Sequence, residues 1–144
     1  MKLKIDNDLL ADEFFENTHL LGIMAPVKNY QFTWLINRHL GFTFRLNNDL
    51  EIQLCKKNRN YFFSIYEYRV AGTTLVHYLY HNQHMGEFLL PEFKHLDYLW
   101  LVRGDDVGEI DLNELQLLIR QIPSVQFVNE MSGEKIKNKR HLIF

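Results

Sequence analysis

Apolar and polar residues alternate through the middle third of the chain, and this period of two constrains the fold more than any other feature. Residues 50–55 alternate strictly, as in a strand with one buried face. Residues 61–70 and 73–81 are rich in aromatic and β-branched side chains, which favour strands. A polar segment at 56–60 and an Ala-Gly pair at 71–72 separate the three runs. The pattern predicts an antiparallel meander.

Two other segments follow the helical period instead. Residues 29–40 place apolar side chains three and four positions apart, between a predicted N-cap at Asn29 and a terminating Gly41. Residues 111–122 repeat this pattern, with Asp111 as the predicted N-cap and a proline directly after the last position. Two principal helices are therefore expected, at about 29–40 and 111–122.

Alternating charged and apolar residues predict a strand at 2–6, and apolar runs predict strands at 20–24, 97–103 and 125–128. The run at 97–103 lacks alternation, so both of its faces should be covered. Together these elements predict an α+β fold, in which a mainly antiparallel sheet of about six or seven strands carries two helices. We expect the first helix to lie against the sheet with little of its surface exposed, because Tyr30 and Trp34 widen its apolar face.

Length and composition predict a single α+β domain, 1–144, with a basic C-terminal tail around 132–144. Hydrophobic residues make up 47% of the chain, enough for a core without disulfides. The lone cysteine, Cys55, favours a reducing compartment. No apolar run suits a secretory leader or a membrane span, so we expect a cytoplasmic protein that does not bind membranes. The net charge of −2 offers no general attraction for nucleic acid, which is not the expected partner.

Three histidines, His77, His81 and His84, would share one face of a helix and could then bind zinc. The branched and aromatic residues around them favour a strand instead. On a strand, four residues span roughly 13 Å, too far for two imidazoles to share one ion. The sequence predicts neither a metal site nor a cofactor.

The carboxylates of Glu92 and Asp97 are the clearest candidate pair for acid–base chemistry. Their alternative role is structural, with one residue beginning a turn and the other opening a strand. The sequence contains no nucleophile elbow and no glycine-rich phosphate loop. These observations lean away from an enzyme, and no catalytic residue is assigned.

Residues 90–98 read Leu-Pro-Glu-Phe-Lys-His-Leu-Asp-Tyr. The segment resembles the signature of the IPExxxVDY family of uncharacterised bacterial, Bacteroidetes-type proteins. Pro91, Glu92, Asp97 and Tyr98 match the motif, while leucine replaces its isoleucine and its valine. The resemblance covers nearly the whole chain and implies no catalytic residues. Structural and binding roles both remain open for these four residues.

Eleven phenylalanines, seven tyrosines and two tryptophans exceed what two helices and one sheet face obviously need. Exposed aromatic side chains often anchor interfaces. Our first hypothesis is a non-enzymatic binding or adaptor protein that acts through an aromatic-rich surface. Tyr66, Tyr68, Tyr78 and Tyr80 are its candidate interface, for another protein or for a second copy in a homodimer.

Two alternatives belong to other classes of function. The first is an enzyme or small-ligand receptor with a cleft near Glu92, Asp97 and the histidines. The second is an RNA-associated protein that uses the cations of the basic tail, which are concentrated in residues 135–140.

Overall fold

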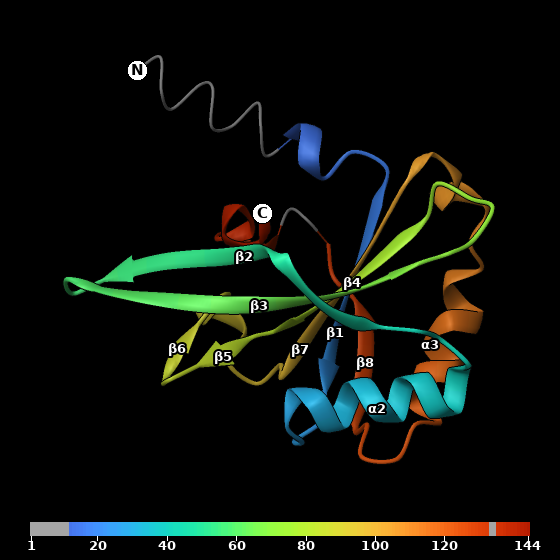
Figure 1. Ribbon diagram of the computed structural model, residues 1–144, viewed down its shortest axis with the longest axis horizontal. Coiled ribbons are helices and arrows are strands. Elements are labelled where there is room, and N and C mark those ends of the chain that lie inside the picture. The colour runs from blue at the N-terminus through green and yellow to red at the C-terminus, as the bar shows by residue number, and fades with distance from the viewer. Residues whose placement is uncertain (1–11, 133–134) are drawn as a thin grey trace.

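The computed structural model describes residues 12–132 and 135–144, and its centre is an antiparallel sheet (Figure 1). The six strands lie in the order β2-β3-β4-β7-β1-β8, and every neighbouring pair is antiparallel. They are β1 (Thr18–Met24), β2 (Arg45–Lys56), β3 (Arg59–Arg69), β4 (Val76–His81), β7 (Tyr98–Arg103) and β8 (Phe127–Glu130). A small hairpin, β5 (Gln83–His84) with β6 (Glu87–Phe88), stands apart. This arrangement confirms the predicted α+β class, while the expected strand at 2–6 lies outside the described residues.

The strands β4 and β7 occupy the middle of the sheet and are buried on both faces. Their register pairs Leu79 with Trp100 and Tyr80 with Leu99. The first five residues of each strand are buried. Apolar side chains on both sides of β7 explain why its sequence shows no alternation.

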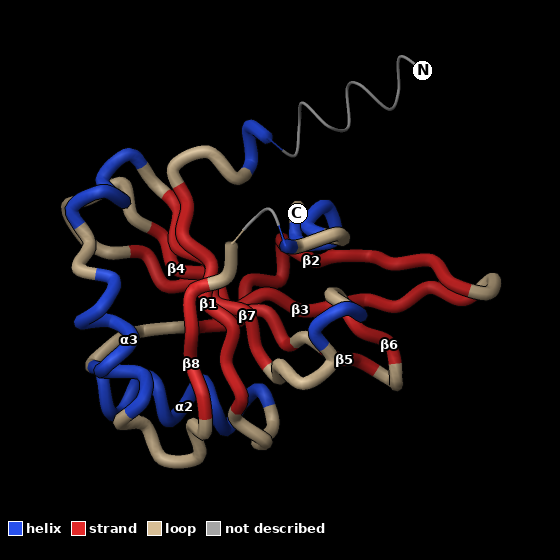
Figure 2. The backbone as a smooth tube through the Cα atoms, turned by 180° about the vertical axis from the view of Figure 1, so that it is seen from behind, coloured by secondary structure: helices blue, strands red, loops and turns tan. Residues whose placement is uncertain are grey.

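Two helices, α2 (Asn29–Leu40) and α3 (Leu112–Arg120), cover one face of the sheet, which we call the helix face. In Figures 1 and 2 both helices lie at the same end of the molecule, beside β8. Phe32 and Ile36 of α2 and Ile119 of α3 are fully buried with Trp100 of β7. These contacts fix α2 rigidly on the sheet.

The helix ends follow the predicted capping chemistry with one correction. Gly41 ends α2 in the left-handed region, at φ 70°. Asp111 caps α3, because its Oδ1 accepts a hydrogen bond from the Glu114 amide at 3.1 Å. The prediction of Asn29 as N-cap is wrong, since Lys28 holds the extended cap position and Asn29 is the first helical residue. The second helix ends at Arg120, two residues earlier than expected.

The opposite face of the sheet, which we call the irregular face, is covered largely by chain without long helices. Residues 89–96, which include a single 3₁₀ turn at Pro91–Phe93, form one part of this cover. The C-terminal segment 135–144 forms another, with Ile136 and Leu142 buried against the sheet. The basic C-terminal tail is thus docked on the sheet, because apolar residues between its cations anchor it.

The strands β2 and β3 extend beyond the body of the molecule as a long hairpin (Figure 1). Its two-residue turn, Lys57–Asn58, has positive φ at both positions, as tight hairpins require. Ile52 and Phe63 pair across the strands and are buried on the irregular face. The predicted alternation is confirmed here.

Among the residues that the structure describes, no helix combines the length and the apolar character needed to cross a membrane.

Candidate functional site

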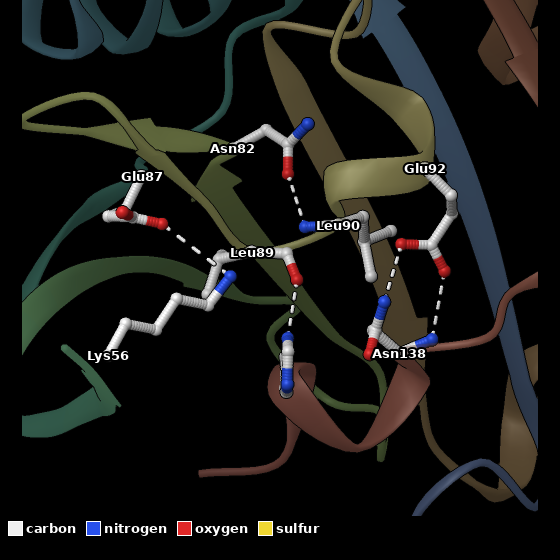
Figure 3. A network of polar contacts seen from close by, with 8 residues as sticks. Lys56, Asn82, Glu87, Leu89, Leu90, Glu92 and Asn138 are labelled. Carbon is white, nitrogen blue, oxygen red and sulfur yellow. Dashed lines mark hydrogen bonds and ion pairs between the residues drawn. The ribbon is translucent and has the colours of Figure 1, made fainter.

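The segment that carries the IPExxxVDY-like motif is held in place by Asn82, which directly follows β4. Asn82 is fully buried, and its side-chain amide donates to the carbonyls of Phe93 and Leu96 at 3.0 and 2.9 Å. Its Oδ1 accepts from the Leu90 amide at 2.9 Å (Figure 3). One side chain thus bonds three backbone groups, of which only the Phe93 carbonyl also has a backbone partner, the Leu96 amide at 3.0 Å.

Glu92 fastens the C-terminal segment to this loop. Its two carboxylate oxygens accept hydrogen bonds from the backbone and side-chain nitrogens of Asn138, each at 2.9 Å (Figure 3). Partial burial acts to raise the pKa of Glu92, but hydrogen bonds from the Asn138 side chain and from backbone amides outweigh it and leave the pKa below its usual value. A second link joins His141 Nδ1 to the Leu89 carbonyl at 2.7 Å. Because a carbonyl only accepts, Nδ1 of His141 carries the proton.

Asp97 and Tyr98 hold the connection between β1 and α2. Asp97 Oδ2 accepts from the Ala25 amide at 2.7 Å, and the Tyr98 hydroxyl donates to the Val27 carbonyl. Burial, followed by the nearby Asp97 carboxylate, raises the pKa of Tyr98. Glu92 and Asp97 therefore bind different segments of the chain, and their contacts do not form a shared acid–base pair.

The three histidines lie on or beside strands, as the sequence predicts. His77 and His81 belong to β4, and His84 belongs to β5. His81 stacks on Tyr98, with ring centroids 4.8 Å apart, and burial lowers its pKa although Asp97 opposes the shift. His77 Nδ1 accepts a hydrogen bond from Trp100 Nε1 at 2.9 Å. Within residues 12–132 and 135–144, no group of three His, Cys, Asp or Glu side chains is arranged to hold a metal ion.

The predicted tyrosine interface is wrong in part. Tyr78 and Tyr80 are buried on the irregular face, where the Tyr80 hydroxyl donates to the Leu142 carbonyl at 2.8 Å. Tyr66 and Tyr68 are only half-buried, and both pack against the core of the helix face. The alternation in β4 suggested one solvated side, but the C-terminal segment covers that side.

The two most exposed aromatic side chains among the described residues lie instead on α2. Tyr30 and Trp34, one helical turn apart, are 59% and 58% exposed. The Arg38 guanidinium lies over the Trp34 ring, 5.3 Å from its centroid. Beside this row is a shallow hollow of about 450 Å³, lined by Val27, Tyr30, Gln31, Trp34, Leu35 and Ser124. We call this surface the α2 aromatic face, and it corrects the expectation that little of α2 is exposed.

One sequence signal for this face existed but was ambiguous. Tyr30, Trp34 and Arg38 recur every four residues and so form one stripe along the helix. Phe32 and Ile36 form a second stripe, and only this one reaches the sheet. Periodicity alone does not decide which of two apolar stripes is buried.

The basic tail presents a mixed surface. Lys135, Lys137 and Arg140 are exposed, whereas Lys139 Nζ lies 3.9 Å from the Asp12 carboxylate. The buried residues between these cations direct them outward from a docked segment.

No protein-family model matches the chain, and no curated protein matches its sequence. The resemblance to the IPExxxVDY family accordingly stays a prediction, based on Pro91, Glu92, Asp97 and Tyr98.

Proposed function

We propose that this protein is a non-enzymatic binding protein whose α2 aromatic face takes an acidic and apolar segment of a partner protein. The observation that carries the proposal is the exposure of Tyr30 and Trp34, each over half exposed on a helix whose other side is buried against the sheet. Tyrosine, tryptophan and arginine are the residues that most often dominate binding energy at interfaces. Here all three types stand in one row.

The α2 aromatic face needs little reorganisation before binding. Phe32 and Ile36 anchor the helix to the sheet with no exposed surface of their own. The Arg38 guanidinium already lies over Trp34, which restricts both side chains. Because fewer side chains must be ordered on association, more of the contact energy remains as affinity.

The charge around the α2 aromatic face selects the chemistry of the partner. Residues 26–46, which include α2, contain the cations Lys28, Arg38 and Arg45 and no acidic residue. Residues 115–129, which supply Ser124 to the hollow, contain Arg120 and no acidic residue. A carboxylate-bearing segment would meet complementary charge, whereas a basic one would be repelled.

The alternative functions receive less support from the geometry. Hydrogen bonds within the fold already engage Glu92 and Asp97, which speaks against the enzyme hypothesis. The RNA hypothesis has exposed cations at Lys135, Lys137 and Arg140, but the described aromatic neighbours of the tail, Phe15 and Phe144, pack into the fold. A cytoplasmic location and membership of the IPExxxVDY family remain further parts of the proposal. Self-association as a homodimer is instead a competing outcome of the test.

A peptide selection with the full chain as bait tests this function. Random twelve-residue peptides displayed on phage should yield binders enriched in Asp and Glu beside aromatic or aliphatic residues. Synthetic versions of the selected peptides should shift the indole N–H signal of Trp34 in a nitrogen–proton NMR spectrum. The indole N–H signal of the buried Trp100 should stay unchanged. Trp34→Ala should weaken binding at least about tenfold, as for a hot-spot residue.

Phe62→Ala is the matched control, because Phe62 is also an exposed aromatic side chain, on β3, and lies outside the α2 aromatic face. This variant should bind the selected peptides normally. Basic peptides, or peptides that bind Trp34→Ala unchanged, would contradict the proposal. Two further results would point to a different partner. If single-stranded polyuridylate shifted the Trp34 signal and bound more tightly than any peptide, the partner would be RNA. If the protein formed a concentration-dependent dimer that Trp34→Ala dissociates, the partner would be a second copy of the chain.

A further inference from the structure

A second hollow lies on the helix face, between the start of α3 and the ends of β3 and β4. Its volume is about 270 Å³, and its walls include Phe42, Tyr68, His77, Leu115 and Leu118. A dry apolar cavity of about 150 Å³ already accommodates benzene. This hollow, which we call the His77 hollow, is therefore large enough for one aromatic ring with a polar substituent.

One polar group in the wall of the His77 hollow is a histidine in a defined protonation state. His77 is only 5% exposed. Burial lowers its pKa to about 4, so the imidazole is neutral near pH 7. Because Trp100 Nε1–H donates to Nδ1, Nδ1 has no proton and the single proton of the ring is on Nε2.

The Nε2–H donor has no use inside the fold that the structure reveals. Among the described residues, the one hydrogen bond of the His77 ring is the bond from Trp100 to Nδ1. The Nε2 donor is not sealed from solvent, because Glu67 Oε2 is the one fully buried side-chain polar atom without a partner among the described residues. A ligand acceptor would therefore take the place of water at this donor. Stacked rings hold the imidazole of His77 in place. The ring centroids of Tyr68 and His77 are 5.5 Å apart, and those of Phe42 and Tyr68 are 4.5 Å apart.

The charge at the hollow restricts the ligand further. Asp111 and Glu114, at the first turn of α3, both line the cavity. Their carboxylates disfavour an anion, and a cationic ammonium group has no acceptor to offer the Nε2–H donor. We propose that the His77 hollow binds a small uncharged aromatic molecule through a hydrogen bond from His77 Nε2 to an acceptor on that molecule.

The two tryptophans of the chain allow a direct test with benzamide as the probe. Trp100 donates to His77, so a ligand on Nε2 should move the indole N–H signal of Trp100 in a nitrogen–proton NMR titration. Trp34 lies on the α2 aromatic face and should give an unchanged signal. Three further ligands carry the same phenyl ring with a different substituent. Benzoate is an anion, benzylammonium is a cation, and toluene has no hydrogen-bond acceptor. Benzamide should bind the tightest of the four, and benzoate should not move the Trp100 signal.

Two variants separate the donor from the cavity. His77→Phe keeps a ring at this position but removes the Nε2–H donor. This variant should bind benzamide roughly threefold to tenfold more weakly, the effect of one neutral hydrogen bond. Its affinity for toluene should be unchanged. Leu118→Trp fills the partly exposed mouth of the hollow and should abolish binding of both, with the His77–Trp100 pair intact. Thermal unfolding of each variant checks that it is folded, and ligand-detected NMR measures binding where the Trp100 signal itself changes.

Equal affinity for toluene and benzamide would overturn the proposal, because the donor would then have no role. Tighter binding of benzylammonium or benzoate would overturn the uncharged class. A Trp100 signal that stays fixed up to the solubility limit of benzamide would overturn the site itself. Binding at the α2 aromatic face is measured by the Trp34 signal alone. A negative result at one of the two sites therefore does not affect the test of the other.

Discussion

The two faces of the sheet are covered in different ways, and the difference explains what their buried polar side chains bond. On the helix face, α2 and α3 bond their own amides and carbonyls, and the two buried polar side chains there, Thr33 and His77, bond a carbonyl within α2 and the Trp100 side chain. On the irregular face, the chain around Leu90 and Leu142 has no such ladder. Side chains must supply the missing partners, since a buried unpaired backbone group is unfavourable.

This contrast gives a physical reading of the motif segment. Glu92 bonds the Asn138 amide, Asp97 bonds the Ala25 amide, and Tyr98 bonds the Val27 carbonyl. Each of these partners is a backbone group just outside regular structure. The pattern that resembles a family signature therefore behaves as a set of fasteners for irregular chain.

The largest effect should come from removing the polar centre of the irregular face. Asn82→Leu keeps the volume of the side chain but leaves the Leu90 amide and the Leu96 carbonyl without their partner. The Phe93 carbonyl loses one of its two bonds and keeps the one from the Leu96 amide. We expect the free energy of unfolding to fall by about 3–5 kcal/mol, because each buried backbone group left unpaired costs about 1–3 kcal/mol. Urea denaturation followed by circular dichroism measures the change.

Thr33→Val is the matched variant on the helix face. Thr33 is also buried and polar, but its hydroxyl donates to the Asn29 carbonyl, which already accepts a backbone bond within the helix. Its removal should change stability by less than about 1 kcal/mol. If the two variants proved equally stable, the contrast between the faces would be wrong.

The helix face should be the more sensitive of the two to acid, because of His77. Burial lowers the pKa of His77 from 6.5 to about 4, so between these values the unfolded chain binds a proton that the folded one excludes. The stabilisation is complete above pH 6.5 and declines as the pH falls toward 4, by roughly 3 kcal/mol at most. Asp111 and Glu114, which line the same hollow, are the carboxylates on the facing helix.

The measurement compares urea denaturation of the native protein and of His77→Phe between pH 7 and pH 4.5. The variant should lose less stability across this window, although His81, whose pKa burial also lowers, leaves it some slope. Parallel profiles for the two proteins would show that His77 is not excluded from protonation in the fold.

The same contrast between faces shows what the sequence could predict. Regular elements can be predicted from local sequence signals. Gly41 ends α2, Asp111 begins α3, and the unbroken apolar run of β7 indicates a strand that is buried on both faces. These signals depend on neighbours in the chain, so α2 was predicted to the residue and the antiparallel sheet in outline.

The irregular face could not be predicted, because its contacts join residues far apart in the chain. Nothing near Asn82 in the sequence indicates that it bonds Leu96, and nothing near Tyr80 reveals that Leu142 covers it. The α2 aromatic face was missed for a related reason, since the stripe that meets the sheet depends on where α2 docks. The motif residues were identified by resemblance, but their partners came only from the structure.

The smallest effect should come from loosening the C-terminal fastener alone. Glu92→Gln replaces one accepting oxygen with an amide that faces the Asn138 donors, so one of the two hydrogen bonds is lost. Because Glu92 is half-buried, we expect a cost of about 1 kcal/mol in global stability. Amide hydrogen exchange should reveal more, with faster exchange confined to residues 136–144.

Glu87→Gln is the control for this last prediction, because Glu87 is another half-buried carboxylate on the irregular side but pairs with Lys56 Nζ at 3.5 Å. It should leave exchange in the C-terminal segment unchanged. Acid should mimic Glu92→Gln: the pKa of Glu92 is lowered, so its stabilisation is present above its ordinary pKa of 4.5 and is lost as the pH falls through the lowered value. If the segment exchanged equally fast in native protein and Glu92→Gln at neutral pH, its docking would depend on Ile136 and Leu142 alone, and the fastener reading of Glu92 would fail.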